Sequence, residues 1–447
     1  MAGNTAVEVD AAIDRAPVGP LTVLVLLLSF VVITFDGYNM ICLSFIAAPL
    51  AKDLAIPVAR FGPLFSAAVF GVLGGGLIIG PASDRLGRKA ILIASVALFG
   101  LFSLLPVVGL TYNQLLICRL VTGVGLGGAI PAAAALTAEY SPRRLRSLFS
   151  GLMFGGVAVG GVVGGFLASR LVPHYGWQAV FWIGGSGPVV LVPLLALLMP
   201  ESIIFLAAFG RKPAYIARIL SRIDRNRVYT ADERFVCGEP RTAKGSIPDL
   251  FHDGRAAGTL LIWSISFCVL FAYGLLVSWL PTVMAQAGMP LPLGILGPVA
   301  LNLGGLFGTV ALGLIARKLG LATPICGGLM LTAVGLLITG NVIANGGPVL
   351  LVIAGTGFFL QGALNMTNAL MAGFYPTSIR STGVGWALGA GRVGGIIGPS
   401  IGGLLLAPKP GTPSLFTICA LVAVIGAMAA ASVGLRYRRG AAAPSAV

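Results

Sequence analysis

The chain has 447 residues, of which 57% are hydrophobic and only 10% are charged, and its mean hydropathy is +0.97. A chain so poor in charge could not cover a water-exposed surface, which excludes soluble enzymes, disordered scaffolds and nucleic-acid-binding proteins. Its apolar runs are about 20 to 30 residues long, the length of membrane-spanning helices rather than of barrel strands. The composition therefore predicts an all-α integral membrane protein.

The net charge of +15 indicates orientation in a membrane rather than binding of nucleic acid. Most Lys and Arg residues fall in one alternating set of loops, including those at residues 85–89, 143–146 and 211–255. The other set of loops carries Lys52, Arg60, Arg170 and Lys409. By the positive-inside rule, we expect both termini and the long central loop to face the cytoplasm. A minor affinity for anionic membrane lipid is compatible with this pattern.

Twelve transmembrane helices can be placed along the chain. They cover residues 20–49, 59–82, 89–110, 112–139, 144–171, 177–199, 256–286, 292–316, 322–343, 347–374, 380–407 and 412–436. The polar segment 200–255 separates six helices from six, and a surface helix is expected within its Ile203–Arg227 stretch. The predicted organisation is a cytoplasmic tail at 1–19, a six-helix bundle at 20–199, a cytoplasmic linker at 200–255, a second six-helix bundle at 256–436 and a tail at 437–447.

The two halves of the chain carry an internal repeat. RSLFSGLMFGGVAVGGVVGG, from Arg146, matches RSTGVGWALGAGRVGGIIGP, from Arg380, with glycines aligned at a constant offset. Both segments would run in the same direction, which predicts two pseudo-symmetric bundles related by an axis normal to the membrane. The small residues permit close helix packing. These small residues are compatible both with tight static packing and with sliding contact between moving halves.

Three ionisable residues lie well inside the predicted spans, where a charge is costly and therefore a functional candidate. Asp36 lies about 22 Å from the cytoplasmic end of its helix, and Arg392 about 18 Å into its own. We expect Asp36 to bind and release a proton; a static ion pair with Arg119 or Arg392 is the alternative. We expect Arg392 to hold an anion through paired hydrogen bonds; a structural pair is again the alternative.

Arg119 and Glu139 are grouped with Asp36 as candidates for proton coupling. Arg119 lies near the outer end of its helix, where snorkelling to the interface is the alternative to a coupling role. Glu139 lies at an inner helix end, where a gate formed with nearby arginines competes with a plain helix cap. The candidate substrate-binding residues besides Arg392 are neutral or aromatic, and packing or interfacial anchoring is the alternative for each. They are Tyr38, Asn39, Tyr273, Trp279, Gln361, Asn365 and Trp386.

The sequence indicates no cofactor. It contains no G-x-x-x-x-G-K-[ST] run for ATP, and its six cysteines show neither metal-ligand spacing nor a disulfide framework. His174 and His252 both lie outside the predicted spans. We therefore expect no metal site and no enzymatic activity, with a proton gradient as the energy source.

The loop from Gly80 to Lys89 reads GPASDRLGRK. It closely resembles the G-x-x-x-D-R-x-G-R-K signature of the major facilitator superfamily. That resemblance implies two pseudo-symmetric six-helix bundles and a gating motif formed by Gly80, Asp84, Arg85, Gly87 and Arg88, with Arg143 and Arg380 as further gating residues. Asp84 would pair with a basic group or a helix N-terminus.

Further segments narrow the resemblance to the aromatic acid:proton symporters of that superfamily. They are FDGYN at 35–39, PES at 200–202, SWLPT at 278–282, QGALN at 361–365 and the stretch 374–399. The resemblance implies proton-coupled import of an aromatic carboxylate such as 4-hydroxybenzoate, protocatechuate or benzoate, by a monomer in the bacterial inner membrane. Asn39 replaces the second acid of the family's D-G-[FY]-D motif, which leaves the proton count open and makes Asn39 a candidate donor to substrate.

Three alternatives remain at this stage. A transporter of another organic anion would share the same features. A drug or metabolite exporter of the same fold is disfavoured by Arg392, because cationic drugs require an acidic cavity. A membrane receptor or integral enzyme without a transport cycle is disfavoured by the repeat and the gating motif.

Overall fold

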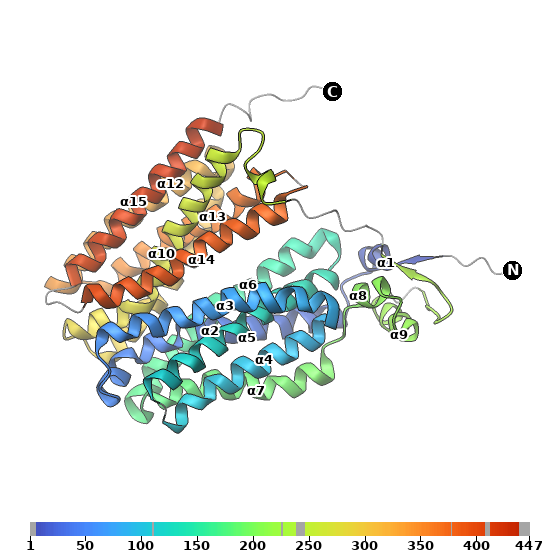
Figure 1. The fold of residues 1–447 in the computed structure, drawn as a ribbon, viewed down its shortest axis with the longest axis horizontal. Coiled ribbons are helices and arrows are strands. Elements are labelled where there is room, and N and C mark those ends of the chain that lie inside the picture. Colours follow the sequence, from blue (N-terminus) through green and yellow to red (C-terminus); the bar gives the residue numbers. More distant parts are fainter. Residues whose placement is uncertain are drawn as a thin grey trace. The chain divides into compact units, whose positions relative to one another are not determined.

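The computed structural model describes residues 6–109, 111–224, 227–237, 246–376, 378–406 and 412–437, so most of the predicted C-terminal tail lies outside the described residues. Nearly all of the described chain is helical (Figure 1). The short elements are β1 (Val7–Glu8), α1 (Val9–Arg15), η1 (Val58–Arg60), η2 (Leu105–Val108), α8 (Ile203–Ala208), α9 (Pro213–Ile223), β2 (Phe235–Val236) and η3 (Pro248–Leu250). The long helices are α2 (Pro20–Asp53), α3 (Phe61–Leu86), α4 (Arg88–Leu104), α5 (Tyr112–Glu139), α6 (Arg143–Tyr175), α7 (Gln178–Leu198), α10 (Ala256–Gln286), α11 (Leu291–Leu319), α12 (Ala322–Asn345), α13 (Val349–Phe374), α14 (Arg380–Leu406) and α15 (Thr412–Tyr437).

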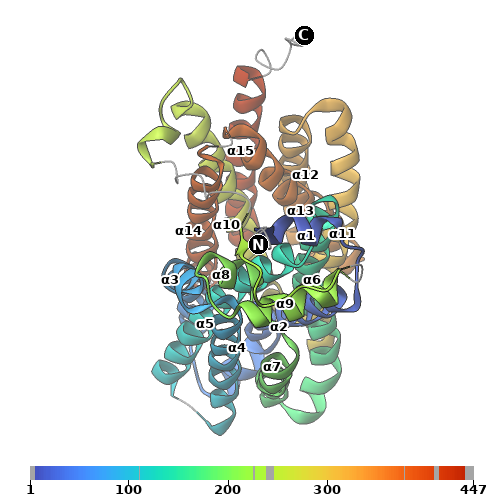
Figure 2. The ribbon, with the colours of Figure 1, turned by 90° about the vertical axis from the view of Figure 1, so that its right-hand side faces the viewer.

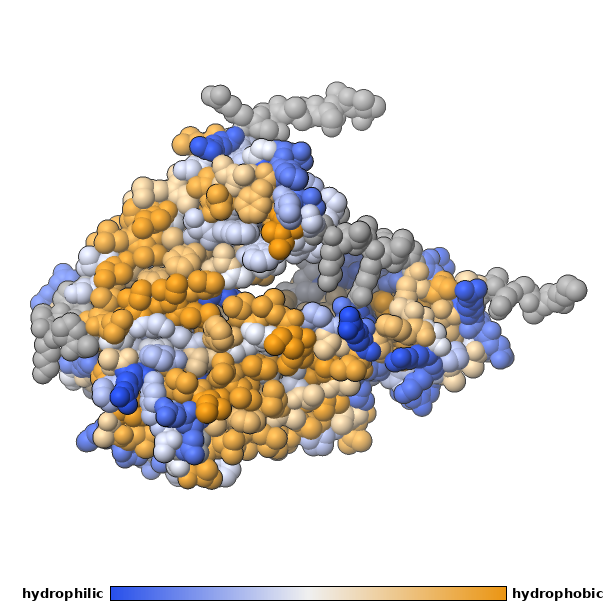
Figure 3. Space-filling model, in the orientation of Figure 1, coloured by the Kyte–Doolittle hydropathy of each residue, from blue (hydrophilic) through white to orange (hydrophobic). Residues whose placement is uncertain are grey.

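Eleven helices within the described residues are long and apolar enough to cross a membrane. The twelfth long helix, α14, is not among these eleven; it contains Arg392 and many glycines. Large apolar side chains are exposed along the helix sides, for example Ile78, Leu197 and Phe307 at 74%, 80% and 71%. Figure 3 shows apolar residues covering much of these sides, as a lipid environment requires. The twelve-helix prediction is confirmed.

The short surface helix expected within Ile203–Arg227 is present as α9, and a further short helix, α8, precedes it. Lys212 adopts a left-handed backbone (φ 52°), and Pro213 begins the second helix. Proline cannot continue the helical hydrogen bonding of a preceding turn but suits a first position. The helical periodicity of the sequence therefore continues across Lys212, where the backbone interrupts the helix.

The chain forms two compact units. Unit 1 lies within residues 1–40, 71–160 and 181–241, and contains most of α2 and α3, the first part of α6, and α4, α5 and α7. Unit 2 lies within residues 41–70, 161–180 and 242–447, and contains the remaining parts of α2, α3 and α6 together with α10 to α15.

An equivalent close contact between two helices occurs in each unit. In unit 1, a Cβ atom on Gly160 of α6 would overlap the carbonyl oxygen of Thr34 on α2. In unit 2, a Cβ atom on Gly394 of α14 would overlap the carbonyl oxygen of Phe267 on α10. Gly160 and Gly394 are aligned in the internal repeat of the sequence. The repeat therefore preserves backbone-to-backbone approach, which only glycine permits at such distances.

The N-terminal segment and part of the linker fold together on unit 1, and we call α1, α8, α9, β1 and β2 the cap (Figure 2). β1 pairs in parallel with β2, joining Val7 to Phe235. One face of α9 is buried, through Ile216, Ile219 and other apolar residues. Asp14 accepts a hydrogen bond from the Arg143 backbone at 2.7 Å and pairs with its guanidinium at 3.0 Å.

Candidate functional site

A buried polar cluster in unit 1 centres on α2. Asp36 and Asn39 are 3% and 0% exposed, and their three-residue spacing places them on one helix face. Asn39 Nδ2 donates to the carbonyl oxygens of Phe35 and of Gly184 on α7, each at 3.0 Å. Asn39 Oδ1 accepts a hydrogen bond from Ser103 Oγ of α4 at 2.7 Å. The amide therefore joins α2, α4 and α7.

This geometry explains why an amide, rather than a second acid, stands at position 39. Both acceptors of the Nδ2 group are backbone carbonyls. An aspartate would place a carboxylate oxygen against the Gly184 carbonyl oxygen and remove the side-chain donor from that buried acceptor. In the structure the Asn39 Nδ2 group donates within the protein, and donation from Asn39 to substrate stays a prediction.

We expect Asn39→Asp to lower the stability of the protein by about 1–3 kcal/mol, the cost of leaving buried polar groups unsatisfied. Thermal unfolding of the purified variant measures the loss. The matched control is Asn113→Asp, because Asn113 is exposed in the first turn of α5, where a negative charge is tolerated or favourable. Equal unfolding midpoints for the two variants would contradict the structural role of Asn39.

Arg119 of α5 belongs to the same cluster. Its side chain is among the largest fully buried ones, and its Nη2 donates to the Asn39 carbonyl oxygen at 2.7 Å. The snorkelling alternative is therefore not observed. Tyr38 is 4% exposed, and its ring packs against Gly184 of α7. Unit 1 thus brings together Asp36, Asn39 and Arg119, with Tyr38 in packing beside them.

A second buried cluster lies in unit 2. Asn302 of α11 accepts hydrogen bonds through Oδ1 from the Tyr273 hydroxyl of α10 at 3.2 Å and from Gln361 Nε2 of α13 at 2.8 Å. Its own Nδ2 donates to the Pro298 carbonyl oxygen at 2.8 Å. One turn beyond Gln361, Asn365 Nδ2 donates to Thr309 Oγ1 at 2.9 Å. Three helices of unit 2 are thereby linked by hydroxyl and amide groups.

Asn302 and Ser103 are among the cluster members that sequence reasoning missed, and Thr309 is another. Each is a small polar residue within an apolar stretch of its helix, and that is the signal that could have identified it. Tyr273, Gln361 and Asn365 were predicted and lie in the unit 2 cluster. Arg392, also in unit 2, is half-buried on α14 between Gly391 and Gly394, which pack on α10.

The two predicted tryptophans lie in packing contacts. Trp279 is fully buried, donates through Nε1 to the Pro399 carbonyl oxygen at 2.8 Å and meets the Phe65 ring edge-on at 5.2 Å. Trp386 stacks on Trp263 at 5.9 Å. Trp263 lies about 15 Å along α10 from Tyr273. Neither tryptophan is brought into the unit 2 polar cluster.

The predicted gating residues of unit 1 form an ionic cluster around Arg88, whose side chain is 6% exposed. Arg88 pairs with Glu139 at 3.0 Å and with Asp84 at 3.5 Å. Ser202 bridges the same groups, since it donates to Glu139 and accepts from Arg88. Glu139 thus contacts Arg88 of the gating motif, and its role in gating or proton coupling stays a prediction.

Other gating residues have separate roles. Gly87 has a positive φ of 101° and faces the Glu201 carboxylate, which accepts a hydrogen bond from the Lys89 backbone at 3.1 Å. The Tyr140 hydroxyl donates to the Glu201 carbonyl oxygen at 2.6 Å, and burial raises the pKa of this phenol well above its usual value, so the donor is retained at physiological pH. Gly80 packs on Pro131, Arg85 is exposed, and the exposed Arg380 donates to the Tyr375 carbonyl oxygen.

The fold is that of a membrane transporter. The structure superimposes on the crystal structure of a D-xylose–proton symporter with a TM-score of 0.70 and 16% sequence identity. The match covers 91% of this chain and 97% of the symporter chain. A bacterial homologue of a human lysosomal transporter, Spinster, in an inward-facing unoccupied conformation, gives a TM-score of 0.71 at 17% identity, covering 94% and 98% of the two chains. The sequence pattern of the Major Facilitator Superfamily matches residues 26–369.

Relatives with higher sequence identity narrow the class of transporter to which the chain belongs. A gallate transporter of Pseudomonas putida is 37% identical over 95% of this chain and 94% of its own length. A 4-hydroxybenzoate transporter of Acinetobacter baylyi is 35% identical over 96% of this chain and 93% of its own length. A benzoate transport protein of the same organism is 35% identical over 90% of this chain and 87% of its own length. The chain therefore belongs to the Major Facilitator Superfamily and, within it, to the aromatic acid:proton symporter family, which consists of transporters and not enzymes.

Proposed function

We propose that the protein imports a small aromatic carboxylate together with protons by alternating access across a bacterial inner membrane. The observation that carries this proposal is the similarity, over nearly the whole chain, to relatives named for gallate, 4-hydroxybenzoate and benzoate. In the proposed orientation both termini and the linker 200–255 are cytoplasmic, and the bundles 20–199 and 256–436 are the moving parts. The protein acts as a monomer, with a proton gradient and no cofactor.

The buried clusters supply the chemistry of the proposed cycle. Asp36 is the proton carrier, because it is a buried carboxylate on the same turn of α2 as the backbone carbonyl that Arg119 holds. Arg392 neutralises the substrate carboxylate, since a guanidinium can bind both carboxylate oxygens at once. Tyr273, Asn302 and Gln361 recognise ring hydroxyl groups, for which amides and phenols provide both donors and acceptors.

Uptake into proteoliposomes tests the proposal. Labelled 4-hydroxybenzoate is supplied with the lumen one pH unit more alkaline than the outside and with the membrane potential clamped at zero. Because 1.4 kcal/mol corresponds to a factor of ten, one coupled proton permits about tenfold accumulation and two permit about a hundredfold. Protein-free liposomes are the control, because protonated aromatic acids cross bilayers unaided.

We expect gradient-stimulated initial rates well above those of protein-free liposomes, with competition by unlabelled gallate and benzoate. Folded protein that transports no aromatic acid in either direction would refute the substrate class. Uptake that requires an opposing gradient would instead identify an exporter.

A further inference from the structure

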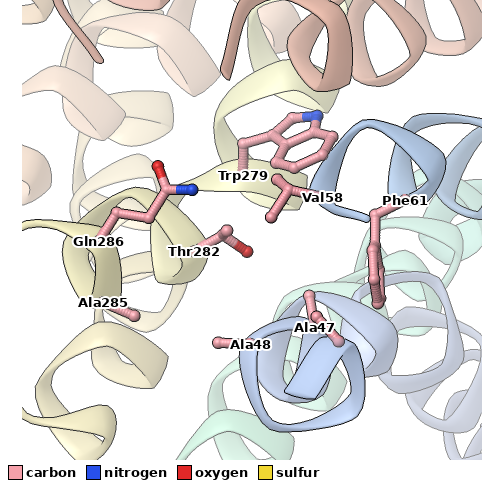
Figure 4. A pocket seen from close by; sticks show the side chains of 9 residues that line it. Ala47, Ala48, Val58, Phe61, Trp279, Thr282, Ala285 and Gln286 are labelled. Atoms are coloured by element: carbon pink, nitrogen blue, oxygen red, sulfur yellow. The ribbon is translucent and has the colours of Figure 1, made fainter. Parts of the chain in front are cut away.

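A pocket in unit 2 is separate from both polar clusters. It has a volume of about 240 Å³ and lies between the last turns of α2, the segment from η1 to the start of α3, and the last turns of α10 (Figure 4). The nine lining residues all belong to unit 2; they are Ala47, Ala48, Ala51, Val58, Phe61, Trp279, Thr282, Ala285 and Gln286. Thr282 lies about 14 Å along α10 from Tyr273. The pocket is therefore not part of the Tyr273–Asn302–Gln361 cluster.

The lining combines an apolar floor with two polar groups. Trp279 and Phe61 are 0% and 1% exposed and form aromatic walls, whereas Gln286 is exposed and marks the mouth. Thr282 is 5% exposed, and its Oγ1 has no hydrogen-bond partner in the structure. Figure 4 shows the Thr282 hydroxyl turned into the space between α10 and the side chains of Val58 and Ala47. A buried hydroxyl without a partner is unfavourable, so a ligand group that reaches it is bound preferentially.

The size and polarity of the pocket fit one aromatic ring. An apolar cavity of about 150 Å³ accommodates benzene, so the larger volume here has room for a ring with two small substituents. The lining contains no charged side chain, which disfavours burial of a carboxylate at the floor. At the mouth, the Gln286 amide can donate to a carboxylate that remains in contact with water. Lys52 and Arg60 are exposed next to the lining residues Ala51 and Phe61 in the sequence and favour an anion there. Asp53, in the same stretch, accepts a hydrogen bond from Trp177 Nε1 at 2.7 Å.

We propose that this pocket is a second binding site for a hydroxylated aromatic acid, with the ring against Trp279 and Phe61, a ring hydroxyl on Thr282 and the carboxylate at Gln286. This inference rests on the proposed function for the identity of the ligand and for the orientation. In that orientation α2 and α10 both end outside the cell, so the site receives the acid before it reaches the buried clusters.

The first experiment compares two substrates in uptake assays. Thr282→Val preserves the shape of the side chain but removes the hydroxyl, and Thr282→Ser retains the hydroxyl. We expect Thr282→Val to raise the half-saturating concentration of 4-hydroxybenzoate about five- to tenfold, the effect of one lost hydrogen bond, and to leave that of benzoate unchanged. Thr282→Ser should behave as the wild type. An equal effect of Thr282→Val on both acids would overturn the assignment of Thr282.

The second experiment does not depend on transport. Ala285→Cys places a thiol in the pocket, and Ala287→Cys places one two residues further on, at an exposed position outside the lining. Both purified variants are alkylated with a maleimide, with and without 4-hydroxybenzoate, and the modified residue is identified by mass spectrometry. We expect saturating 4-hydroxybenzoate to slow alkylation at position 285 at least about fivefold, as ligand occupancy predicts, and to leave position 287 unchanged.

The two readouts separate the two proposals. Protection at position 285 without any uptake would support the site and refute the transport function. Uptake without protection would overturn the site and leave the transport function intact. Protection that persists in the Ala285→Cys/Thr282→Val double variant for benzoate, but weakens for 4-hydroxybenzoate, would support the proposed orientation of the ring.

Discussion

Asp36→Asn should abolish proton-driven uptake while the substrate site remains able to bind. Asp36 is a carboxylate buried in the unit 1 cluster, next to the turn of α2 that Arg119 holds through the Asn39 carbonyl oxygen. An asparagine retains the shape but can neither gain nor lose a proton in the physiological range. Without a carboxylate that binds and releases the proton, gradient-driven uptake should fall at least about a hundredfold, equivalent to about 2.8 kcal/mol.

The measurement is uptake of labelled 4-hydroxybenzoate under an inward proton gradient, followed by counterflow in proteoliposomes preloaded with unlabelled acid. Counterflow needs no net proton movement, so we expect Asp36→Asn to retain it. The matched control is Asp53→Asn, the same change at the other end of α2, where an amide oxygen can still accept the hydrogen bond from Trp177 Nε1. Undiminished gradient-driven uptake by Asp36→Asn would exclude Asp36 as the proton carrier.

The long helices were predictable because their signal is strong and local. The spans at 112–139 and 256–286 coincide with α5 and α10, since turn residues interrupt the apolar runs at both ends. Of the cap, only a surface helix within Ile203–Arg227 was predicted, and the pairing of β1 with β2 was not. β1 and β2 have two residues each and pair across more than two hundred residues of chain, so neither carries a periodic pattern of its own. Only tertiary contact with unit 1 stabilises elements of that length.

The site was predictable in its charges and less so in its hydrogen bonds. Asp36, Arg119 and Arg392 stand out because a charge in an apolar span is rare. The role of Asn39 depends on the Gly184 carbonyl oxygen, which the sequence does not place near α2. For Trp279 the sequence indicates a large aromatic residue but cannot distinguish a substrate wall from a packing contact. The structure shows that Trp279 packs through Nε1 on a backbone carbonyl oxygen and through its ring on Phe65, and that it also lines the pocket in unit 2.

Glu139→Leu should destabilise unit 1 by about 3–5 kcal/mol, because it leaves the buried Arg88 guanidinium without its closest carboxylate. Arg88 and Glu139 have side chains that are 6% and 12% exposed and lie 3.0 Å apart, whereas Asp84, at 3.5 Å, is 40% exposed and compensates only in part. The thermal unfolding midpoint of purified protein measures the loss. Asp14→Asn serves as the comparison, since its pair with Arg143 is largely exposed and contributes about 0–1 kcal/mol.

The double variant Arg88→Met/Glu139→Leu distinguishes the loss of the attraction between the two side chains from the cost of leaving the buried Arg88 charge without its partner. Replacing both partners of a buried ion pair by apolar residues is often neutral or stabilising, whereas removing one partner leaves an uncompensated charge. We therefore expect the double variant to unfold at a higher temperature than Glu139→Leu alone, helped by the Phe205 ring that already lies 5.6 Å from the Arg88 guanidinium carbon. A double variant no more stable than Glu139→Leu would mean that Arg88 is stabilised by other groups and that the pair does not hold the α4–α5 ends together.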